Sequence, residues 1–464
     1  MEYLTVHEIS KKWKMNERRV TSLCRDNRIA GVRKEGNTWL IPSDSLMPLD
    51  MRTKEYEEVV KSYNDNTISY SSGGDRVVEY FRKKYKKDPM YTTFTPYRIC
   101  PLGAHVDHNL GKITGFAIDK GIHFAYSIKN NGVIELESLQ FPKRAQWHVL
   151  DTPREKEGDW ADHLRGATIA LGKRFLLRYG LSAVIDGELP IGGLSSSAAV
   201  IITFINALAS LNNIELSPEL LIEISREAEN NYVGVSCGKL GQACEIYSKK
   251  DKLLYMDMKD DSYELIDTPK NMKPFVIGLF FSGIEKSLES SKYNMRTDEA
   301  RSAAYSLLAF SGLKYGKFND TNLRDVDYDI YLKYKDKLPD NFRKRAEHFY
   351  SENERVEQGV IAWKKGNIDE FGRLVNESGL SSINNWETVS DELIKLYEIL
   401  KNSKGVYGTR FSGAGFKGCL IAFINPKYLD SVLENTSKKY LEEYPHLKNK
   451  YSAHICHSAD GVKL

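Results

Sequence analysis

The 464-residue sequence has no long apolar run and no excess of one charge. Its longest apolar stretches, residues 275–281 and 419–424, are far shorter than the roughly 18 to 20 residues that span a bilayer. The 66 basic and 63 acidic residues leave a formal net charge of +3, which predicts neither a nucleic-acid nor a membrane partner for the whole chain. These absences favour a folded, soluble protein with no membrane partner.

Cysteine and histidine spacings also exclude several classes of protein. The six cysteines lie far apart, unlike a disulfide framework or a CxxC zinc site, and the ten histidines show no HExxH spacing. The first residues lack a basic start followed by an apolar run, so no secretory signal is predicted. We therefore expect a cytoplasmic protein, and the length predicts roughly three domains.

Residues 1–50 predict two short helices and a hairpin. Thr5 and Glu8 have the spacing of a capping box, and a second, arginine-bearing helix would turn Val20 inward. With the hairpin expected at residues 31–42, the segment resembles the winged helix-turn-helix modules of the excisionase and MerR-like family.

That resemblance implies DNA binding through Arg18, Arg19 and Arg25 on the second helix. A solvated basic helix and a protein-binding module are the alternatives, because the segment holds nine basic against seven acidic residues. Residues 51–74 are charged and then rich in Asn, Ser and Gly, which predicts a linker.

The first of three glycine-marked motifs is RICPLGAHVDHN at residues 98–109, after an amphipathic helix expected near residues 77–85. Arg98, His105 and Asp107 bring hydrogen-bond donors and acceptors together beside a glycine, which suits a ligand with several hydroxyl groups. By itself this motif leaves a surface loop as an alternative.

The second motif, PIGGLSSSAA at residues 190–199, precedes an apolar helical run. Its glycines let the backbone approach an anion, and its serines open a helix whose first amides and dipole favour phosphate. The motif predicts a phosphate cradle made of Gly192, Gly193, Leu194, Ser195, Ser196 and Ser197.

The third motif, GTRFSGAGFKGC at residues 408–419, precedes an apolar strand at residues 420–424. Gly413 and Gly415 lie in this loop, which we expect to pack against the phosphate cradle. A sharp turn without a role in binding is the alternative.

Together with AENNYVGVSCG at residues 228–238 and KSLESSKYNMR at residues 286–296, the three motifs resemble the galactokinase branch of the GHMP kinases over residues 75–464. The resemblance implies an α+β fold with a ribosomal protein S5 domain 2-like domain over residues 75–270. A ferredoxin-like domain would follow over residues 271–464, with ATP and sugar in the cleft between the two.

The same resemblance assigns roles to individual residues. Arg98 would stabilise the transferring phosphoryl group, while Ser197 and Glu229 would hold Mg²⁺. The cradle residues, Gly413 and Gly415 would bind ATP. The residues expected to contact the sugar are Ala104, His105, Asp107, Gly238, Gly241 and Tyr293.

Three departures from the family pattern affect this assignment. The phosphate loop is one residue shorter than usual. Ala104 replaces the usual glutamate, as in the similar galacturonokinase subgroup, and its small side chain would not repel a carboxylate at C6 of the sugar. Gly241 replaces an aspartate regarded as the base for the sugar's C1 hydroxyl, while Lys239 could supply a cation near a sugar acid.

We therefore predict ATP-dependent phosphorylation of a hexose or hexuronate at C1, with galacturonate favoured over galactose. Because Gly241 cannot accept a proton, the alternative is a regulator that senses sugar and ATP, is weakly active or inactive as a kinase, and acts through the helix-turn-helix module.

Overall fold

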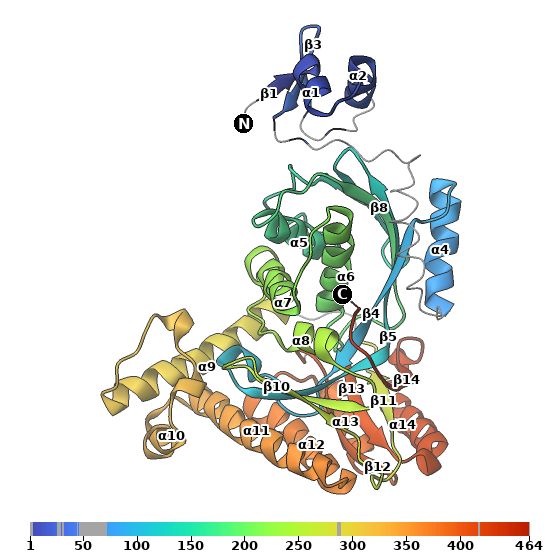
Figure 1. Cartoon of the computed structure of the whole chain (residues 1–464). Coiled ribbons are helices and arrows are strands. Elements are labelled where there is room, and N and C mark those ends of the chain that lie inside the picture. Colours follow the sequence, from blue (N-terminus) through green and yellow to red (C-terminus); the bar gives the residue numbers. More distant parts are fainter. Residues whose placement is uncertain are drawn as a thin grey trace.

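The structure is a computed structural model that describes residues 3–25, 29, 32–43, 45, 72–284, 289–415 and 418–463. These residues form sheets of three, eight and four strands (Figure 1). Most of the predicted linker, residues 51–71, lies outside the described ranges. Within them, no helix is long and apolar enough to cross a bilayer.

The N-terminal unit contains two helices and a three-stranded antiparallel sheet of order β1-β3-β2. Its elements are β1 (Tyr3–Thr5), α1 (Val6–Lys12), α2 (Glu17–Arg25), β2 (Arg33–Glu35) and β3 (Thr38–Pro42). The expected capping box is confirmed, because Thr5 caps α1 and Glu8 bonds back to the Thr5 amide at 2.7 Å. Val20 is buried in a small core of this unit, as predicted.

The eight-stranded sheet follows in the chain and has the order β10-β9-β5-β8-β6-β7, with β4 and β15 also paired to β5. Its strands are β4 (Tyr91–Ile99), β5 (Lys112–Lys129), β6 (Val133–Ser138), β7 (Ala145–His148), β8 (Gly180–Gly187), β9 (Lys252–Asp257), β10 (Tyr263–Asp267) and β15 (Ser458–Ala459). All pairs are antiparallel except β6 with β8.

Helices cover both faces of this sheet. One face carries α4 (Ser72–Tyr85), the expected amphipathic helix, which begins three residues before the predicted start of the domain. The helices of the other face and its loops are η1 (Asp107–Asn109), α5 (Asp162–Gly172), α6 (Ser196–Leu211), α7 (Pro218–Glu227), the π-helical turn η2 (Ala228–Val233) and α8 (Leu240–Tyr247). Figure 1 shows α4 and α6 on opposite sides of the strands.

The C-terminal part is built on an antiparallel sheet of order β12-β13-β11-β14. Its strands are β11 (Val276–Phe281), β12 (Val406–Phe411), β13 (Cys419–Ile424) and β14 (Ser452–Cys456). Its longer helices are α9 (Glu289–Ser311), α10 (Tyr328–Tyr334), α11 (Asp340–Lys364), α12 (Ile368–Ser381), α13 (Asp391–Lys401) and α14 (Leu429–Glu443). Short turns are η3 (Phe318–Asp320), η4 (Leu323–Asp325), η5 (Lys335–Lys337), η6 (Ser382–Trp386), η7 (Pro426–Tyr428) and η8 (Pro445–Leu447).

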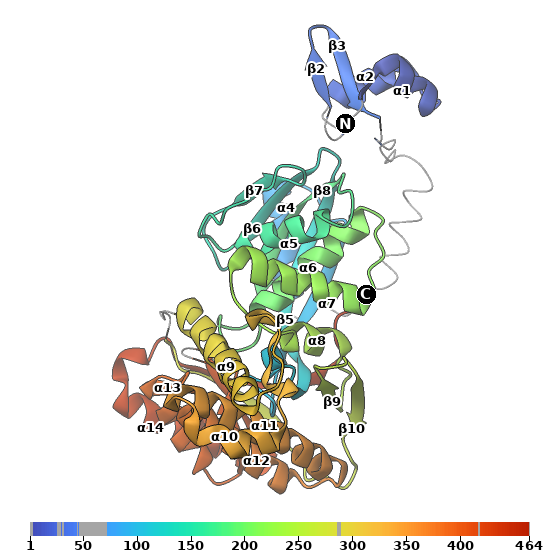
Figure 2. The ribbon, with the colours of Figure 1, turned by 90° about the vertical axis from the view of Figure 1, so that its left-hand side faces the viewer.

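A continuous hydrophobic core joins the two larger sheets. Phe116 on β5 contacts Trp363 on α11 with ring centroids 5.4 Å apart, and Phe371 on α12 lies 4.9 Å from Trp363 and 5.6 Å from Phe423 on β13. Figure 2 shows the two parts meeting along β5 and α8. The first motif lies at this junction, so its position depends on both parts.

A buried carboxylate fixes the first motif to the C-terminal helices. Glu352 on α11 is 0 % exposed and accepts hydrogen bonds from the Gly103 amide at 2.8 Å, Ser378 Oγ at 2.5 Å and Arg355 Nε at 2.8 Å. Arg410 Nη1 lies 3.3 Å away. Burial opposes ionisation, but the charges of Arg355 and Arg410 outweigh it and lower the pKa of Glu352 to about 2.

We expect Glu352→Gln to lower the free energy of unfolding by about 3 to 5 kcal/mol, because the buried Arg410 and the half-buried Arg355 would lose their counter-charge. The wild-type contribution should be complete above the ordinary glutamate pKa near 4.5 and should disappear as the pH falls toward 2. Urea unfolding at pH 7 and at pH 3 measures both effects. Glu354→Gln, an exposed neighbour on α11, is the control, and a loss no larger than in this control would contradict the prediction.

Candidate active site

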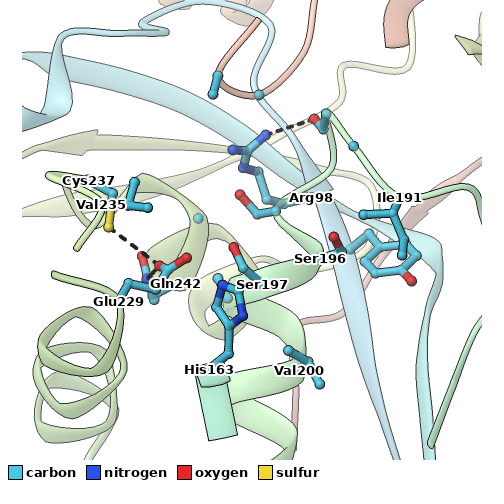
Figure 3. A pocket seen from close by; sticks show the side chains of 18 of the residues that line it. Arg98, His163, Ile191, Ser196, Ser197, Val200, Glu229, Val235, Cys237 and Gln242 are labelled. Atoms are coloured by element: carbon cyan, nitrogen blue, oxygen red, sulfur yellow. Dashed lines mark hydrogen bonds between the residues drawn. The ribbon is translucent and has the colours of Figure 1, made fainter. Parts of the chain in front are cut away.

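A cavity of about 440 Å³ collects most of the predicted site residues (Figure 3). Its walls come from the end of β4, the start of α6, α8 and the loop before β13. The predicted residues that line it are Arg98, Ala104, His105, Asp107, Gly192, Gly193, Ser195, Ser196, Ser197, Glu229, Gly238, Gly241, Tyr293 and Gly413. Leu194 is instead buried beneath the loop, and a Cβ on Gly415 would meet the Thr388 carbonyl oxygen at 2.1 Å.

The second motif forms a tight loop at the start of α6. Gly192, Gly193 and Ser195 all have positive φ, of 128°, 87° and 55°. The loop therefore leads into Ser196 and Ser197, the first residues of the 16-residue helix α6. The free backbone amides at this end of the helix face the cavity. A helix N-terminus of this kind attracts anions through its free amides and its dipole.

The third motif packs directly on that loop, as expected from the sequence. A Cβ on Gly413 would lie 2.6 Å from Gly193 Cα, and a Cβ on Gly193 would lie 2.8 Å from Cys419 Sγ. Ser412 Oγ donates to the Gly193 carbonyl at 2.5 Å. The two loops thus touch at backbone distance, which glycine alone permits.

Arg98 enters the cavity from β4 just after an irregular step in the pairing of β4 with β5. Its backbone amide donates to the Leu194 carbonyl at 3.3 Å, and its Nη1 lies 3.5 Å from the Gly193 carbonyl. The side chain is only 7 % exposed, yet its Nε has no hydrogen-bond partner among the described residues. The guanidinium therefore lies beside the phosphate loop as the one arginine of the cavity lining.

Asp107 lies against α8 on the opposite wall. Its Oδ2 accepts from the Leu240 amide at 3.1 Å, and a Cβ on Gly238 would meet that oxygen at 2.2 Å. Burial disfavours the charged carboxylate, but His108, 3.8 Å from Oδ1, and the Leu240 amide outweigh it, so the pKa of Asp107 is lowered. An ionised carboxylate is thus available to accept from a ligand hydroxyl.

The ring of His105 stacks on Trp386 at 5.3 Å, with 13° between the planes. Its Nε2 is buried without a partner among the described residues, and burial holds the pKa of His105 well below its usual range. His348 supports the same loop, because its Nε2 lies 3.0 Å from the Ala104 carbonyl. Since burial lowers the pKa of His348 to about 4, the neutral ring donates this hydrogen bond.

Glu229 lies on η2, across the cavity from Arg98 (Figure 3). Its Oε2 accepts from Gln242 Nε2 at 2.7 Å and from Cys237 Sγ at 3.4 Å, which leaves Oε1 for a cation. Ser197 also points into this space in Figure 3. The described residues contain no cluster of three metal-ligating side chains. Carboxylate and hydroxyl oxygens are the kind of ligands that Mg²⁺ takes in phosphate-binding sites.

Gly241 lies on α8, and a side chain at this position would project toward Ser195 in the second motif. A Cβ there would meet Ser195 Oγ at 2.7 Å and Ala198 Cβ at 3.4 Å. The Ser195 hydroxyl therefore occupies the space into which a side chain at position 241 would project. A carboxylate at this position would require Ser195 to move.

The prediction for Lys239 needs correction. Its ammonium group forms an ion pair with Asp261 in the loop between β9 and β10, and it does not line the cavity. Lys239 lies only two residues before Gly241 in the sequence, at the N-cap of α8. This nearness did not place its ammonium group in the cavity.

Sequence reasoning missed an aromatic wall and a histidine. Phe141 and Trp160 line the cavity with stacked rings 5.9 Å apart and 4° from parallel. His163 on α5 points its ring toward Ser197 in Figure 3, and burial lowers its pKa against the opposing charge of Glu229. None of these residues belongs to a glycine-marked motif, so only the folded structure associates them with the site.

Comparison with known families agrees with this geometry. Residues 162–249 match the GHMP kinases N terminal domain, and residues 360–441 match the GHMP kinases C terminal domain. The fold and the cavity define a sugar or metabolite kinase of this type, and the chain belongs to the GHMP kinase family.

Its relatives include proteins named galacturonokinase and galactokinase. The chain is 36% identical to a galacturonokinase of Arabidopsis thaliana over 402 residues, which cover 82% of this chain and 94% of that protein. It is 31% identical to a galactokinase of Clostridium perfringens over 380 residues, covering 81% and 96%. The crystal structure of Lactococcus lactis galactokinase complexed with galactose superposes with a TM-score of 0.76 at 25% identity, covering 83% of this chain and 98% of that one.

We expect Gly193→Ala to weaken ATP binding by about tenfold or more, equal to about 1.4 kcal/mol, because the added Cβ would push the cradle away from β13. Calorimetric titration with ATP measures the effect. Gly312→Ala is the matched control, since Gly312 also has positive φ but has open space around its Cβ position. Equal ATP affinities in the two variants would contradict the prediction, because Gly312 lies outside the cavity lining.

Proposed function

We propose that this protein transfers the terminal phosphoryl group of ATP to the C1 hydroxyl of a hexose or hexuronate. The observation that supports this most strongly is the shared cavity: the start of α6, which suits phosphate, and Asp107 and His105, which suit hydroxyl groups, line the same 440 Å³. The relatives named galacturonokinase and galactokinase support the same reaction class.

Each wall of the cavity has a distinct task in this proposal. The amides at Ser196 and Ser197 hold the phosphates, and Arg98 neutralises charge on the group in transfer. Glu229 and Ser197 would hold Mg²⁺, whose chemistry is to neutralise phosphate charge and fix its geometry. Asp107 orients the sugar by accepting from one of its hydroxyls.

The C1 hydroxyl must lose a proton without help from position 241. Gly241 offers no acceptor, and Ser195 Oγ fills the space beside it. Phosphoryl transfer passes through a loose transition state in most analyses, so the nucleophile needs little activation and the proton can leave late. We therefore infer a kinase that works mainly by positioning and is slower than one with a dedicated base.

Galacturonate is the proposed preferred sugar. Ala104 presents only a methyl group to the cavity, so no carboxylate at this position repels a C6 carboxylate. Lys239 contributes nothing to this preference because it is paired with Asp261.

We expect ATP turnover with galacturonate to exceed that with galactose by about tenfold in kcat/KM, or about 1.4 kcal/mol. Coupled assays over a panel of hexoses and hexuronates measure this directly. Ala104→Glu should reverse the preference through like-charge repulsion, whereas Ala104→Gln, of equal size but uncharged, should not. A tenfold preference of the wild type for galactose would refute the assignment of the sugar.

A second role, in transcription, is proposed for residues 1–50 as a winged helix-turn-helix module. Its support is one small core that α1, α2 and β3 share, with Arg18 and Arg25 exposed and Arg19 half-buried on α2. On the hairpin, the Arg33 guanidinium lies 4.1 Å from the centre of the Tyr3 ring. The helix would enter a DNA groove while the hairpin follows the backbone.

We expect the full chain to bind a duplex selected from random DNA, with an affinity that changes in the presence of sugar and ATP, as reciprocal linkage requires. Replacing Arg18 and Arg25 by alanine should weaken binding at least tenfold, while Lys11→Ala on α1 should not. Gel-shift titrations measure both. Deleting residues 1–60 should leave sugar and ATP affinities unchanged, and identical DNA affinity with and without ligands would argue against a sensor.

A further inference from the structure

The carboxyl of Glu245 on α8 is a buried group that takes no part in the site contacts described above. The residue is 0 % exposed, and neither of its carboxyl oxygens has a hydrogen-bond partner among the residues that the structure describes. Buried carboxyl groups are nearly always paired or hydrogen-bonded, because an unpaired one costs free energy. Glu245 therefore requires a reason beyond packing.

Its position on α8 places it just beneath the cavity. Gly241 and Gln242 line the cavity, and Glu245 follows them by four and three residues, so the three lie on one face of the helix. One residue earlier, Cys244 Sγ lies against Gly115, whose Cβ position is 3.5 Å from the Ile99 carbonyl on β4. Helix α8 thus packs against the end of β4 that carries Arg98.

Arg98 has a buried hydrogen-bond donor that lacks an acceptor among the described residues. Its Nε is buried without a partner in the described part of the chain, and its Nη1 contact with the Gly193 carbonyl is long at 3.5 Å. Burial raises the pKa of Glu245 well above its usual range, and Arg98 is the cation whose charge opposes this rise. A donor and an acceptor, both buried and both without a partner among the described residues, are therefore near one another where α8 packs against β4.

We propose that Glu245 is a positioning residue for Arg98, accepting the Nε hydrogen through one enclosed water so that the terminal N–H groups of the guanidinium face the phosphoryl group in transfer. This inference rests on the proposed kinase function, since it assigns the support of the group that neutralises phosphate charge. A bridging water satisfies both groups at little cost.

The proposal also accounts for the chemistry at Gly241. A kinase without a base at that position depends more heavily on accurate placement of its charge-neutralising group, because positioning supplies most of the catalysis in phosphoryl transfer. Glu245 does not line the cavity and so cannot take the proton of the sugar hydroxyl itself. Its carboxyl acts instead on Arg98, from behind the residues that line the cavity.

The test compares Glu245→Leu, which removes the acceptor at similar volume, with Glu245→Gln, which keeps an acceptor oxygen of the same reach. We expect Glu245→Leu to lower kcat about tenfold with KM values for sugar and ATP unchanged, and Glu245→Gln to stay within about threefold of wild type. The melting temperatures of both variants are measured alongside, so that a loss of kcat caused by unfolding is recognised as such. Glu137→Gln, at a buried β6 glutamate paired with Lys84, is the control and should leave kcat unchanged.

Dependence on Arg98 is tested in a double-mutant cycle. In an Arg98→Lys background, which lacks Nε, Glu245→Leu should cause no further loss of kcat. Wild-type kcat in Glu245→Leu, an equal loss in Glu245→Gln, or additive losses in the cycle would each overturn the proposal.

A binding measurement separates this inference from the proposed function. Calorimetry with ADP, Mg²⁺ and aluminium fluoride reports the affinity for a mimic of the phosphoryl group in transfer without any turnover. We expect Glu245→Leu to weaken this affinity about tenfold while the affinity for ADP alone is unchanged. A wild type that phosphorylates no sugar would refute the proposed function, and the calorimetric result would still decide the role of Glu245.

Discussion

The site depends on the buried contact between the Glu352 carboxylate and the Gly103 amide. Gly103 belongs to the first motif, whereas Glu352 lies on α11, 249 residues later. Arg355, Ser378 and Arg410 hold the carboxylate of Glu352 in place. Any relative movement of the two parts would break the hydrogen bond from the Gly103 amide and expose the buried carboxylate to water. The residues of the first motif that line the cavity are therefore positioned by a network that lies outside the cavity lining.

A second constraint acts on the phosphate side. The loop at Gly193 and the loop at Gly413 approach at backbone distance, and the Ser412 hydroxyl closes the contact. Since one loop starts α6 and the other leads into β13, the start of α6 is in contact with both parts of the molecule. The two sides of the cavity are thus fixed by separate contacts that span the same junction.

Local patterns in the sequence predicted the elements that carry these contacts. The capping box at Thr5, the amphipathic α4, the apolar α6 and strand β13 were all recognisable, because their signals lie within a few residues. The partners of Glu352 and the unsatisfied carboxyl of Glu245 were not, since each lies in an ordinary helical stretch and gains meaning only through distant residues. Lys239 shows the converse error: its nearness to Gly241 in sequence predicted a cation in the cavity, but a loop carboxylate holds it elsewhere.

Strand β15 has a consequence for how the protein is made. Ser458 pairs with Ile118, and the Val462 amide donates to the carbonyl of Glu245 at 2.8 Å, so residues at the end of the described chain complete a sheet begun some 340 positions earlier. During synthesis the short stretch of β5 at Ala117 and Ile118, between the parts that pair with β9 and β8, stays unpaired on that side until these residues have been added. Contacts of such long sequence separation slow folding and leave unpaired edges exposed to other chains. The yield of active protein should then depend on temperature and chaperones during expression more than its final stability would suggest.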